Sequence, residues 1–311
     1  MNRKYLHILL LSSILFYTCG KSGKSNAEQT ASLVSGSSQE ETVENNPKPL
    51  SEAFKKYWYN GTAEITSYDL QQARYGEMRE GNAVLIYVTE EFLPEEQVKA
   101  NRQNPTNIPV LKLNMTRNFN TGIYPYSIME STFYPTGNHQ HALKTVSSMQ
   151  EWCGQMYAQL NNRSKFEITT HSYFEGEEDQ DFTLDKAILE NELWLQIRID
   201  PTSLPIGSHS VIPGLAYANM KHIALKSHPA ELSLQKQDST NVYTIQYPKL
   251  QRKLQITFTN TSPYTITSWE ETYISRGKEM TSKATLKKQI RSAYWGKNSN
   301  LDEVLREELG L

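Results

Sequence analysis

Alternation of apolar and polar residues is the main pattern of the chain beyond residue 50, and it predicts β-strands. Residues 110–115 place Leu111, Leu113 and Met115 on one side and polar residues on the other, as in a half-buried strand. Residues 82–89 are apolar at both parities, so this strand is expected to be covered on both faces. Further strands are predicted at 63–68, 123–134, 242–247, 254–258, 264–273 and 284–294.

Helical spacing of apolar residues occurs at three places. It extends over 183–198, which predicts one long helix that ends at Pro201. A short helix is predicted at 51–58. Another is predicted near the C-terminus, where Asn300 and Glu303 have the spacing of a capping box.

Hairpins are expected to join successive strands. Residues 143–160 and 166–174 predict two arms around a turn at 161–164, because the second arm alternates at period two. Hairpin after hairpin with one inserted helix predicts a mainly β (α+β) fold. We therefore expect a curved antiparallel sheet or barrel-like core, with one inserted helix and a short C-terminal helix.

The N-terminus has the layout of an export signal. Arg3 and Lys4 precede a largely apolar stretch at 6–17 that ends before Cys19, and this arrangement resembles a lipoprotein signal peptide. The apolar stretch is shorter than the roughly 20 residues of a transmembrane helix. We expect acylation of Cys19 to attach the chain to a lipid bilayer. The run 16–18 departs from the commonest signal pattern, so an unlipidated anchor or cleavage elsewhere remains an alternative.

The signal also predicts location and domain organisation. Gly20 follows Cys19 where an Asp would favour retention in the inner membrane, so the expected location is the outer membrane, facing the periplasm. Residues 20–49 are polar and contain no aromatic side chain, which predicts a disordered tether. Residues 1–19 are thus the signal, 20–49 the tether and 50–311 a β-rich globular domain.

Composition excludes some classes of partner. The formal net charge is -2 and 38% of the residues are apolar, so neither nucleic-acid binding nor a highly charged disordered chain is indicated. The second cysteine, Cys153, has no intramolecular partner if Cys19 carries lipid. Because Trp152 and Gly154 flank it and no cation is adjacent, we predict a buried structural thiol rather than a nucleophile.

The acidic loop at 175–181 is the best candidate for a metal site, and His171 and Glu175 are its weak candidate ligands. Its spacing is not that of a calcium-binding hand, so a solvated loop is the favoured interpretation and no metal, cofactor or catalytic residue is assigned. His139 and His141 are interpreted as part of an exposed loop. Arg74 with Glu77 is a second candidate for hydrolytic chemistry.

Two surfaces are candidates for interaction. The aromatic cluster at 57–59 either plugs one end of the β core, which is favoured, or contacts lipid or glycan. Lys283, Lys287 and Arg291 are expected to share one face of a strand, with Lys288 and Lys297 nearby. This face either binds anionic lipid or cell-wall polymer or is an ordinary solvated surface, which is the default.

Several blocks of sequence resemble a family of envelope lipoproteins of Bacteroidota-type Gram-negative bacteria, over about residue 51 to the C-terminus. The blocks lie at 57–65 (YWYNGTAEI), 73–77 (ARYGE), 118–125 (NFNTGIYP), 151–154 (EWCG) and 292–295 (SAYW). Such sequences are sometimes labelled septum formation inhibitor Maf. The chain lacks the Ser-X-Ser-X-Arg block of Maf pyrophosphatases, so the resemblance implies an envelope lipoprotein and carries no catalytic residue.

Three functions are open, and we rank them in order. The first is a non-enzymatic binding or carrier module whose curved sheet encloses an apolar or envelope ligand. The second is an assembly component that holds another envelope protein, and the third is a periplasmic metal-assisted hydrolase. The sequence contains no nucleophile elbow, phosphate-binding loop, dinucleotide fingerprint or zinc-protease helix, so it gives no ground for naming a reaction.

Overall fold

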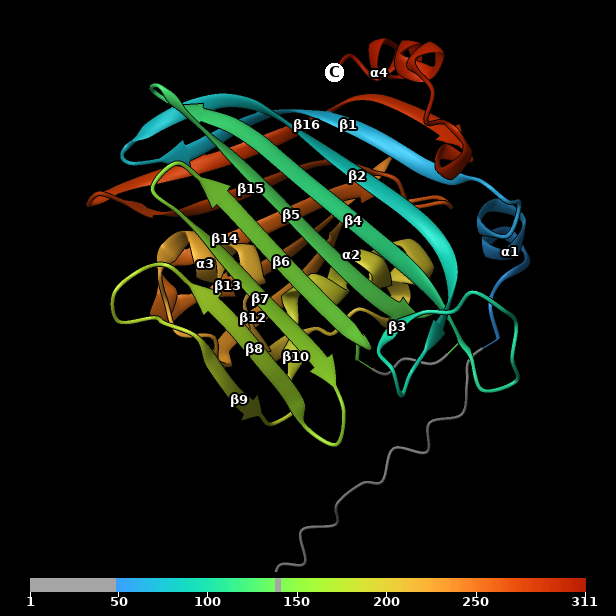
Figure 1. The fold of residues 1–311 in the computed structure, drawn as a ribbon, viewed down its shortest axis with the longest axis horizontal. Helices are drawn as coiled ribbons and strands as arrows, with labels where there is room; N and C mark the ends of the chain where they lie inside the picture. The colour runs from blue at the N-terminus through green and yellow to red at the C-terminus, as the bar shows by residue number, and fades with distance from the viewer. Residues whose placement is uncertain (1–48, 138–140) are drawn as a thin grey trace, which may run out of the picture. The chain divides into compact units, whose positions relative to one another are not determined.

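Sixteen β-strands form one sheet in the computed structural model, which describes residues 49–137 and 141–311 (Figure 1). The first nine are β1 Ala63–Arg74, β2 Glu77–Leu93, β3 Val98–Lys99, β4 Ile108–Thr121, β5 Tyr124–Pro135, β6 Lys144–Glu151, β7 Gly154–Asn162, β8 Phe166–Ser172 and β9 Gln180–Leu184. The others are β10 Ile188–Leu189, β11 Gly207–Ile212, β12 His228–Lys236, β13 Thr240–Tyr247, β14 Arg252–Thr259, β15 Ile266–Ser275 and β16 Lys278–Ser292.

The helices are few and short. They are α1 Glu52–Trp58, α2 Glu190–Ile199, α3 Leu215–Lys221 and α4 Val304–Glu308, with 3-10 turns η1 Pro201–Ser203, η2 Pro248–Leu250, η3 Tyr294–Gly296 and η4 Asn300–Glu303. Among the helices of the described residues, none has the length and hydropathy of a membrane span. The predicted signal, Cys19, most of the predicted tether and His139 lie outside the described residues.

The order of strands leaves the sheet open. From one edge to the other it runs β10-β11-β12-β13-β14-β15-β16-β1-β2-β4-β5-β6-β7-β8-β9, with β3 paired to β2 alone. All neighbours are antiparallel except β10 and β11. The two edge strands, β9 and β10, are consecutive in the chain and are joined by residues 185–187. The sheet therefore curls until its edges approach at this link without pairing.

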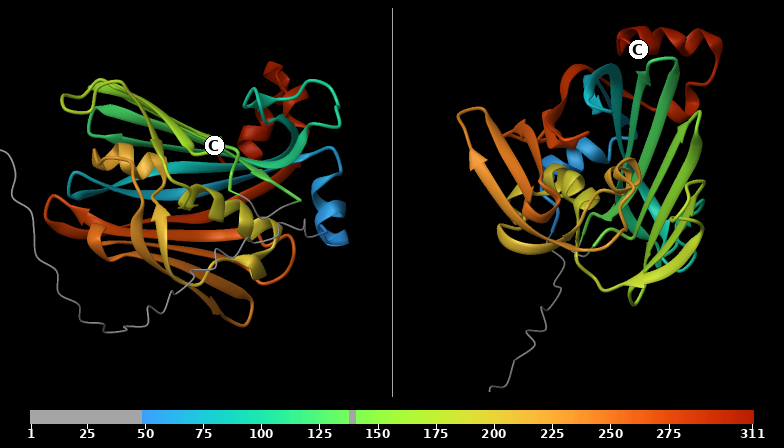
Figure 2. Two further views of the ribbon diagram at one scale, coloured as in Figure 1. Left: turned by 90° about the horizontal axis from the view of Figure 1, so that it is seen from below. Right: turned by 90° about the vertical axis from the view of Figure 1, so that its left-hand side faces the viewer.

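The curled sheet surrounds α2 and α3, which lie between β4–β8 on one side and β12–β15 on the other (Figure 2). Leu193, Leu195 and Ile197 of α2 are buried in the core that this concave face forms. The expected curved antiparallel sheet with an inserted helix is thus confirmed, and α3 is a further helix in the same space.

The C-terminal segment covers the convex face of the sheet over β1 and β2. Leu309, directly after α4, is 5% exposed and packs with Ile65 of β1 and Val84 of β2. Ala83, Leu85 and their alternate neighbours on β2 pack into the concave core instead. The prediction that both faces of 82–89 are covered is confirmed. The capping pair of the C-terminal turn is Ser299 with Asp302, not Asn300 with Glu303.

Within the aromatic cluster at 57–59, Trp58 belongs to the core of the domain, Tyr57 packs against this core while partly buried, and Tyr59 is 46% exposed. Ser51 caps α1 by accepting a hydrogen bond from the N–H of Phe54. Trp58 is 1% exposed and packs on Tyr87, 5.9 Å between ring centroids. The favoured interpretation, a cluster packed on the end of the β core, agrees with this burial.

Two predicted elements are wrong in extent. Residues 180–184, partly inside the predicted helix at 183–198, pair with β8 as strand β9, because an antiparallel partner satisfies their backbone groups better than an isolated helical turn does. The long first arm at 143–160 is two strands, β6 and β7, that turn at Trp152 and Cys153. Cys153 is therefore exposed rather than buried, since it lies in the turn.

A β-bulge at Lys287 changes which residues share a face. Ser67 pairs with Lys288 and Tyr68 pairs with Leu286, so Lys287 is an extra residue on β16. The extra residue reverses the alternation, and Arg291 points to the other face, where its guanidinium donates to the carbonyl of Tyr57 at 2.8 Å. The expectation that Lys283, Lys287 and Arg291 form one basic face is wrong for Arg291.

Candidate functional site

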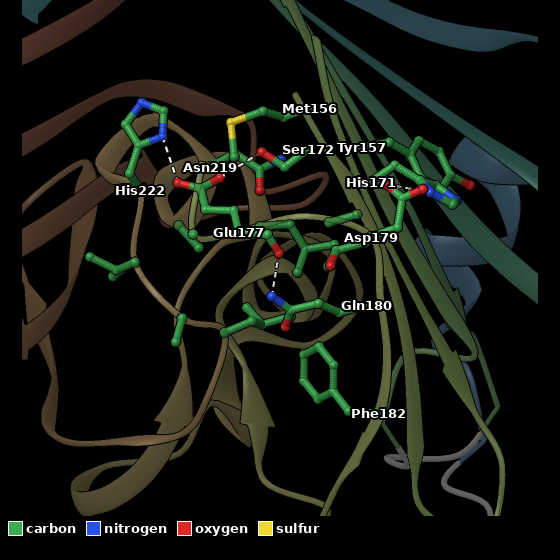
Figure 3. A pocket seen from close by; sticks show the side chains of 18 of the residues that line it. Met156, Tyr157, His171, Ser172, Glu177, Asp179, Gln180, Phe182, Asn219 and His222 are labelled. Carbon is green, nitrogen blue, oxygen red and sulfur yellow. Dashed lines mark hydrogen bonds and ion pairs between the residues drawn. The ribbon is translucent and has the colours of Figure 1, made fainter. Parts of the chain in front are cut away.

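A pocket of about 630 Å³ opens beside the unpaired edge of the sheet, and we call it the seam pocket (Figure 3). Strands β7, β8 and β9 with the loop at 173–179 form one wall, and α3 with residues 222–225 forms the other. The edge strand β9 contributes Gln180, Asp181 and Phe182 to the first wall.

One part of the pocket wall is apolar. Its side chains come from alternate residues of β7 and β9, which face inward because strand residues point to opposite faces in turn, and from one face of α3 and the segment after it. They are Met156, Ala158, Phe182, Leu215, Ala218, Ile223, Ala224 and Leu225.

The acidic loop supplies the polar part of the pocket. Glu177 accepts hydrogen bonds from the Ser172 hydroxyl at 2.7 Å and from Nδ1 of His222 at 2.8 Å, and Gln180 donates to the carbonyl of Glu177. Gly176 has a φ of 84°, a conformation open to glycine, and this lets the loop turn Glu177 inward. The loop is therefore tied to the end of α3.

Asn219 of α3 lies in the wall with a polar group that has no partner. Its side chain is 8% exposed, and its Nδ2 donates no hydrogen bond to any residue that the structure describes. His222 follows three residues later and contacts Glu177, so the amide is close to the polar end of the pocket. A buried donor without an acceptor is costly, so this amide can donate to a molecule that enters the pocket.

The charge of the wall is one-sided. Among the residues that the structure describes, its lining includes Glu177, Asp179 and Asp181 and neither lysine nor arginine. His171 and Asp179, which both line the pocket, form a pair at 3.2 Å that lies apart from Glu177 and His222 (Figure 3). The inner part of the pocket therefore combines an apolar surface with one carboxylate and several uncharged polar groups.

The weak metal candidates are not brought together. His171 is 56% exposed and pairs with Asp179, and no hydrogen bond or ion pair joins it to Glu175 within the described residues. Over residues 49–137 and 141–311, no group of three or more His, Cys, Asp or Glu side chains is placed to hold a metal ion. His141 is half-buried and contacts Glu192 of α2 at 2.9 Å, where we had expected an exposed loop.

Arg74 and Glu77 serve different partners. The Arg74 guanidinium donates to the carbonyl of Met220 and to the Tyr126 hydroxyl at 3.0 Å, and it therefore fastens the β1–β2 hairpin to α3. Glu77 forms an ion pair with Arg79. Burial and a hydrogen bond with Tyr75 raise the pKa of Tyr126, as expected for a structural contact.

Within the described residues, the concave interior is largely filled, which differs from the enclosed space for an apolar ligand that we expected. It holds a cavity of about 40 Å³, lined by charged side chains that include Arg117, Glu130, Arg252 and Glu271. Ion pairs and α2 fill the rest of this space. The seam pocket, at the edge of the sheet, has the size of a ligand site.

The basic face is neutralised by neighbouring acids. Lys283 contacts Glu270 at 2.9 Å and Lys287 contacts Asp69 at 3.1 Å. Oppositely charged neighbours on a solvated sheet face are ordinary surface structure. This surface agrees with the default interpretation.

The residues on α3 were missed by sequence reasoning. No element was predicted between Pro205 and residue 240, although Leu215 to Met220 are largely apolar and form a helix there. The signal that could have been used is this short apolar run after Pro213-Gly214. Its position against β5, β6 and β7 depends on contacts that are distant in the sequence.

An open, curved antiparallel β-sheet protein with a pocket at its edge is the class that fold and site define. The chain matches no protein-family model and no curated protein. Among solved structures it is similar to the crystal structure of a beta-barrel-like protein of domain of unknown function DUF1849 from Brucella abortus. The TM-score is 0.43 at 8% identity, over 74% of this chain and 98% of that chain.

Proposed function

We propose that this protein is a binding module of a membrane-anchored envelope lipoprotein and that it holds a small ligand in the seam pocket. The observation that carries the proposal is a pocket of about 630 Å³ whose wall joins an apolar surface to the unpartnered amide of Asn219. Ligand sites are typically about 300–1,000 Å³ and combine apolar walls with few polar groups. The absence of a partner for Asn219 favours binding over a purely structural role.

The membrane anchor in this proposal comes from the sequence. Acylation of Cys19 would hold the domain at the outer membrane, facing the periplasm, where envelope ligands are available. Mass spectrometry of the N-terminus of the mature protein, isolated from its native host, tests this part. An N-terminus at Cys19 with acyl mass supports it, and any other N-terminus contradicts it.

Ligand occupancy is tested by filling the pocket. Ala224 lines the pocket and is exposed, so Ala224→Trp places an indole in the pocket without a change in the buried core. Mass spectrometry of organic extracts from protein purified from native membranes should find a small molecule with the unchanged chain. The molecule should be absent with the Ala224→Trp variant.

Ala53→Trp is the matched control, because Ala53 is exposed on α1 and does not line the pocket. It should retain the extracted molecule in the same amount as the unchanged chain. Equal amounts in all three proteins, or none in the unchanged chain, would contradict binding in the seam pocket.

A further inference from the structure

The wall of the seam pocket selects against anionic ligands. Within the part of the chain that the structure describes, it contains three carboxylates and no Lys or Arg side chain, and the inner carboxylate, Glu177, already accepts hydrogen bonds from Ser172 and His222. A carboxylate or phosphate head in this pocket would lose its hydration and meet like charge, and the two imidazoles of the wall, His171 and His222, already pair with Asp179 and Glu177. Free fatty acids and phosphate-bearing lipid heads are poorly matched to this site.

The buried donor of Asn219 selects for a group with an accepting oxygen. Its Nδ2 lacks a partner within the part of the chain that the structure describes, and the side chain is 8% exposed. An ammonium group has no acceptor and would leave this donor unsatisfied. A carbonyl oxygen on the ligand would satisfy it.

Glu177 can accept one further hydrogen bond at the same end of the pocket. Each of its carboxylate oxygens accepts a single bond, from Ser172 or from His222, and a carboxylate offers about four acceptor positions. An N–H on the ligand would use this capacity. A carbonyl acceptor and an N–H donor in one uncharged group are the two halves of an amide.

We infer that the ligand of the seam pocket is an uncharged amphiphile with an amide head and a hydrocarbon chain. The amide carbonyl accepts from Asn219, the amide N–H donates to Glu177, and the chain lies along Met156, Phe182 and Leu225. This inference rests on the proposed function, because it names the ligand class of the same pocket.

Three probes with the same chain test the head group: octanamide, octylammonium and octanoate. Isothermal titration calorimetry with the whole chain should give tightest binding for octanamide, weaker binding for octylammonium and weakest for octanoate. The dissociation constants of octanamide and octanoate should differ by at least about tenfold. Octanoate or octylammonium binding as tightly as octanamide would overturn the amide assignment.

Two variants test the residues. Asn219→Leu should weaken the binding of octanamide by about tenfold and leave the binding of octylammonium nearly unchanged, because only the amide accepts a hydrogen bond from Asn219. Glu177→Gln should strengthen octanoate by about tenfold, since it removes the like charge. Glu175→Gln is the matched control for charge, because Glu175 is an exposed carboxylate of the same loop outside the pocket wall.

A gain in octanoate affinity of the same size with Glu175→Gln would overturn the assignment to Glu177.

Circular dichroism and the melting temperature check that each variant is folded. Asn219→Asp is a second variant at this position, and it should shift the binding preference from octanamide to octylammonium. A peptide, N-acetyl-leucyl-leucinamide, carries the same amide chemistry on branched side chains. If this peptide binds about tenfold tighter than octanamide, the inference that the ligand carries a hydrocarbon chain is wrong.

The failure of this inference can be separated from the failure of the proposed function. If the probes bind and Ala224→Trp abolishes their binding, but octanoate is not disfavoured, only the ligand class is wrong. If no probe binds and the extraction experiment also recovers no molecule from the unchanged chain, the binding function itself is wrong.

Discussion

Buried charges of opposite sign connect the interior helix to the sheet. Arg198 of α2 forms a two-bond ion pair with Glu64 of β1, with both N–O distances at 2.7 Å and both side chains fully buried. Arg252 of β14 contacts Glu190 of α2 and Glu271 of β15 in the same way. Such pairs contribute little net stability when complete, but an unpaired partner is strongly destabilising. They therefore set the position of α2 rather than the strength of the core.

Removal of one partner should show this asymmetry. Arg198→Met leaves the Glu64 carboxylate buried without its cation, and we expect it to lower the free energy of unfolding by about 3–5 kcal/mol. The double variant Arg198→Met/Glu64→Gln removes the unpaired charge and should recover about 1–3 kcal/mol. Urea unfolding measures both values. A double variant that is less stable than the single one would contradict the expectation.

The same ion pair should make the free energy of unfolding depend on pH. Burial alone would raise the pKa of Glu64, but the charge and hydrogen bonds of Arg198, with the Tyr57 hydroxyl, lower it below the ordinary value of 4.5. Because the native pKa lies below the unfolded one, the contribution is complete above about pH 4.5 and is lost as the pH falls through the native pKa.

The test is urea unfolding of the unchanged chain and of Glu64→Gln from about pH 7 to about pH 2. The stability difference between them should be largest near neutral pH and should shrink in acid. A difference that is constant over this range would show that Glu64 does not titrate as argued.

At the scale of elements, the C-terminal segment packs on the convex face of the sheet. Leu309 packs on the convex side of β1 and β2, and its carbonyl accepts a hydrogen bond from the Ser67 hydroxyl at 2.5 Å. Leu301 of η4 is 89% exposed in the same segment. The apolar residues predicted to form one stripe here thus divide into a buried end and an exposed end.

Two substitutions separate these ends. Leu309→Ala should cost about 2–3 kcal/mol, because it removes a buried side chain from a small cluster. Leu301→Ala should change the free energy of unfolding by less than about 0.5 kcal/mol. Chemical denaturation measures both, and equal effects would contradict the packing of Leu309 on the sheet.

The success of sequence patterns at this scale depended on whether the deciding contacts were local. Residues 110–115 and 242–247 alternate because one face of each strand is buried. Both strands could therefore be predicted from the sequence. Residues 183–184 satisfied a helical spacing, but their pairing with β8 decided their conformation. One extra residue at Lys287 moved Arg291 to the other face. A bulge depends on register between strands, which no single segment specifies.

For the whole molecule, the strands that come first and last along the chain, β1 and β16, pair with each other. β1 pairs with β16 in the middle of the strand order, at registers such as Tyr68 with Leu286. The centre of the sheet therefore cannot form until the end of the chain is available. Pairings this distant in sequence are slow to form, and without β16 both β1 and β15 would be left as open edges.

Truncation tests this dependence. A chain that ends at residue 276 lacks β16 and should not show cooperative unfolding in urea. A chain that ends at residue 297 lacks only η4 and α4, and it should unfold cooperatively with lower stability than the whole chain. A cooperative transition in the shorter chain would show that β16 is not needed for the fold.

The candidate site was predictable only in part. The acidic loop was singled out from its composition, and it does supply Glu177 to the pocket. Of the two candidate ligands, His171 of β8 lines the pocket but pairs with Asp179 rather than with Glu177, and Glu175 does not line it, because alternation along β8 and the turn after it decide which side chains point inward. Asn219 and His222 could not be connected to this loop from the sequence, since they approach it only when the sheet curls.

By itself, the sequence determined the strand-rich domain, most strand positions and the need to cover both faces of β2. These features depend on local periodicity, which each segment carries alone. The tertiary structure decided the strand order, the face of Arg291, the exposure of Cys153 and the pocket beside α3. Each of these depends on register and on the approach of two sheet edges, and such contacts join residues that no local pattern connects.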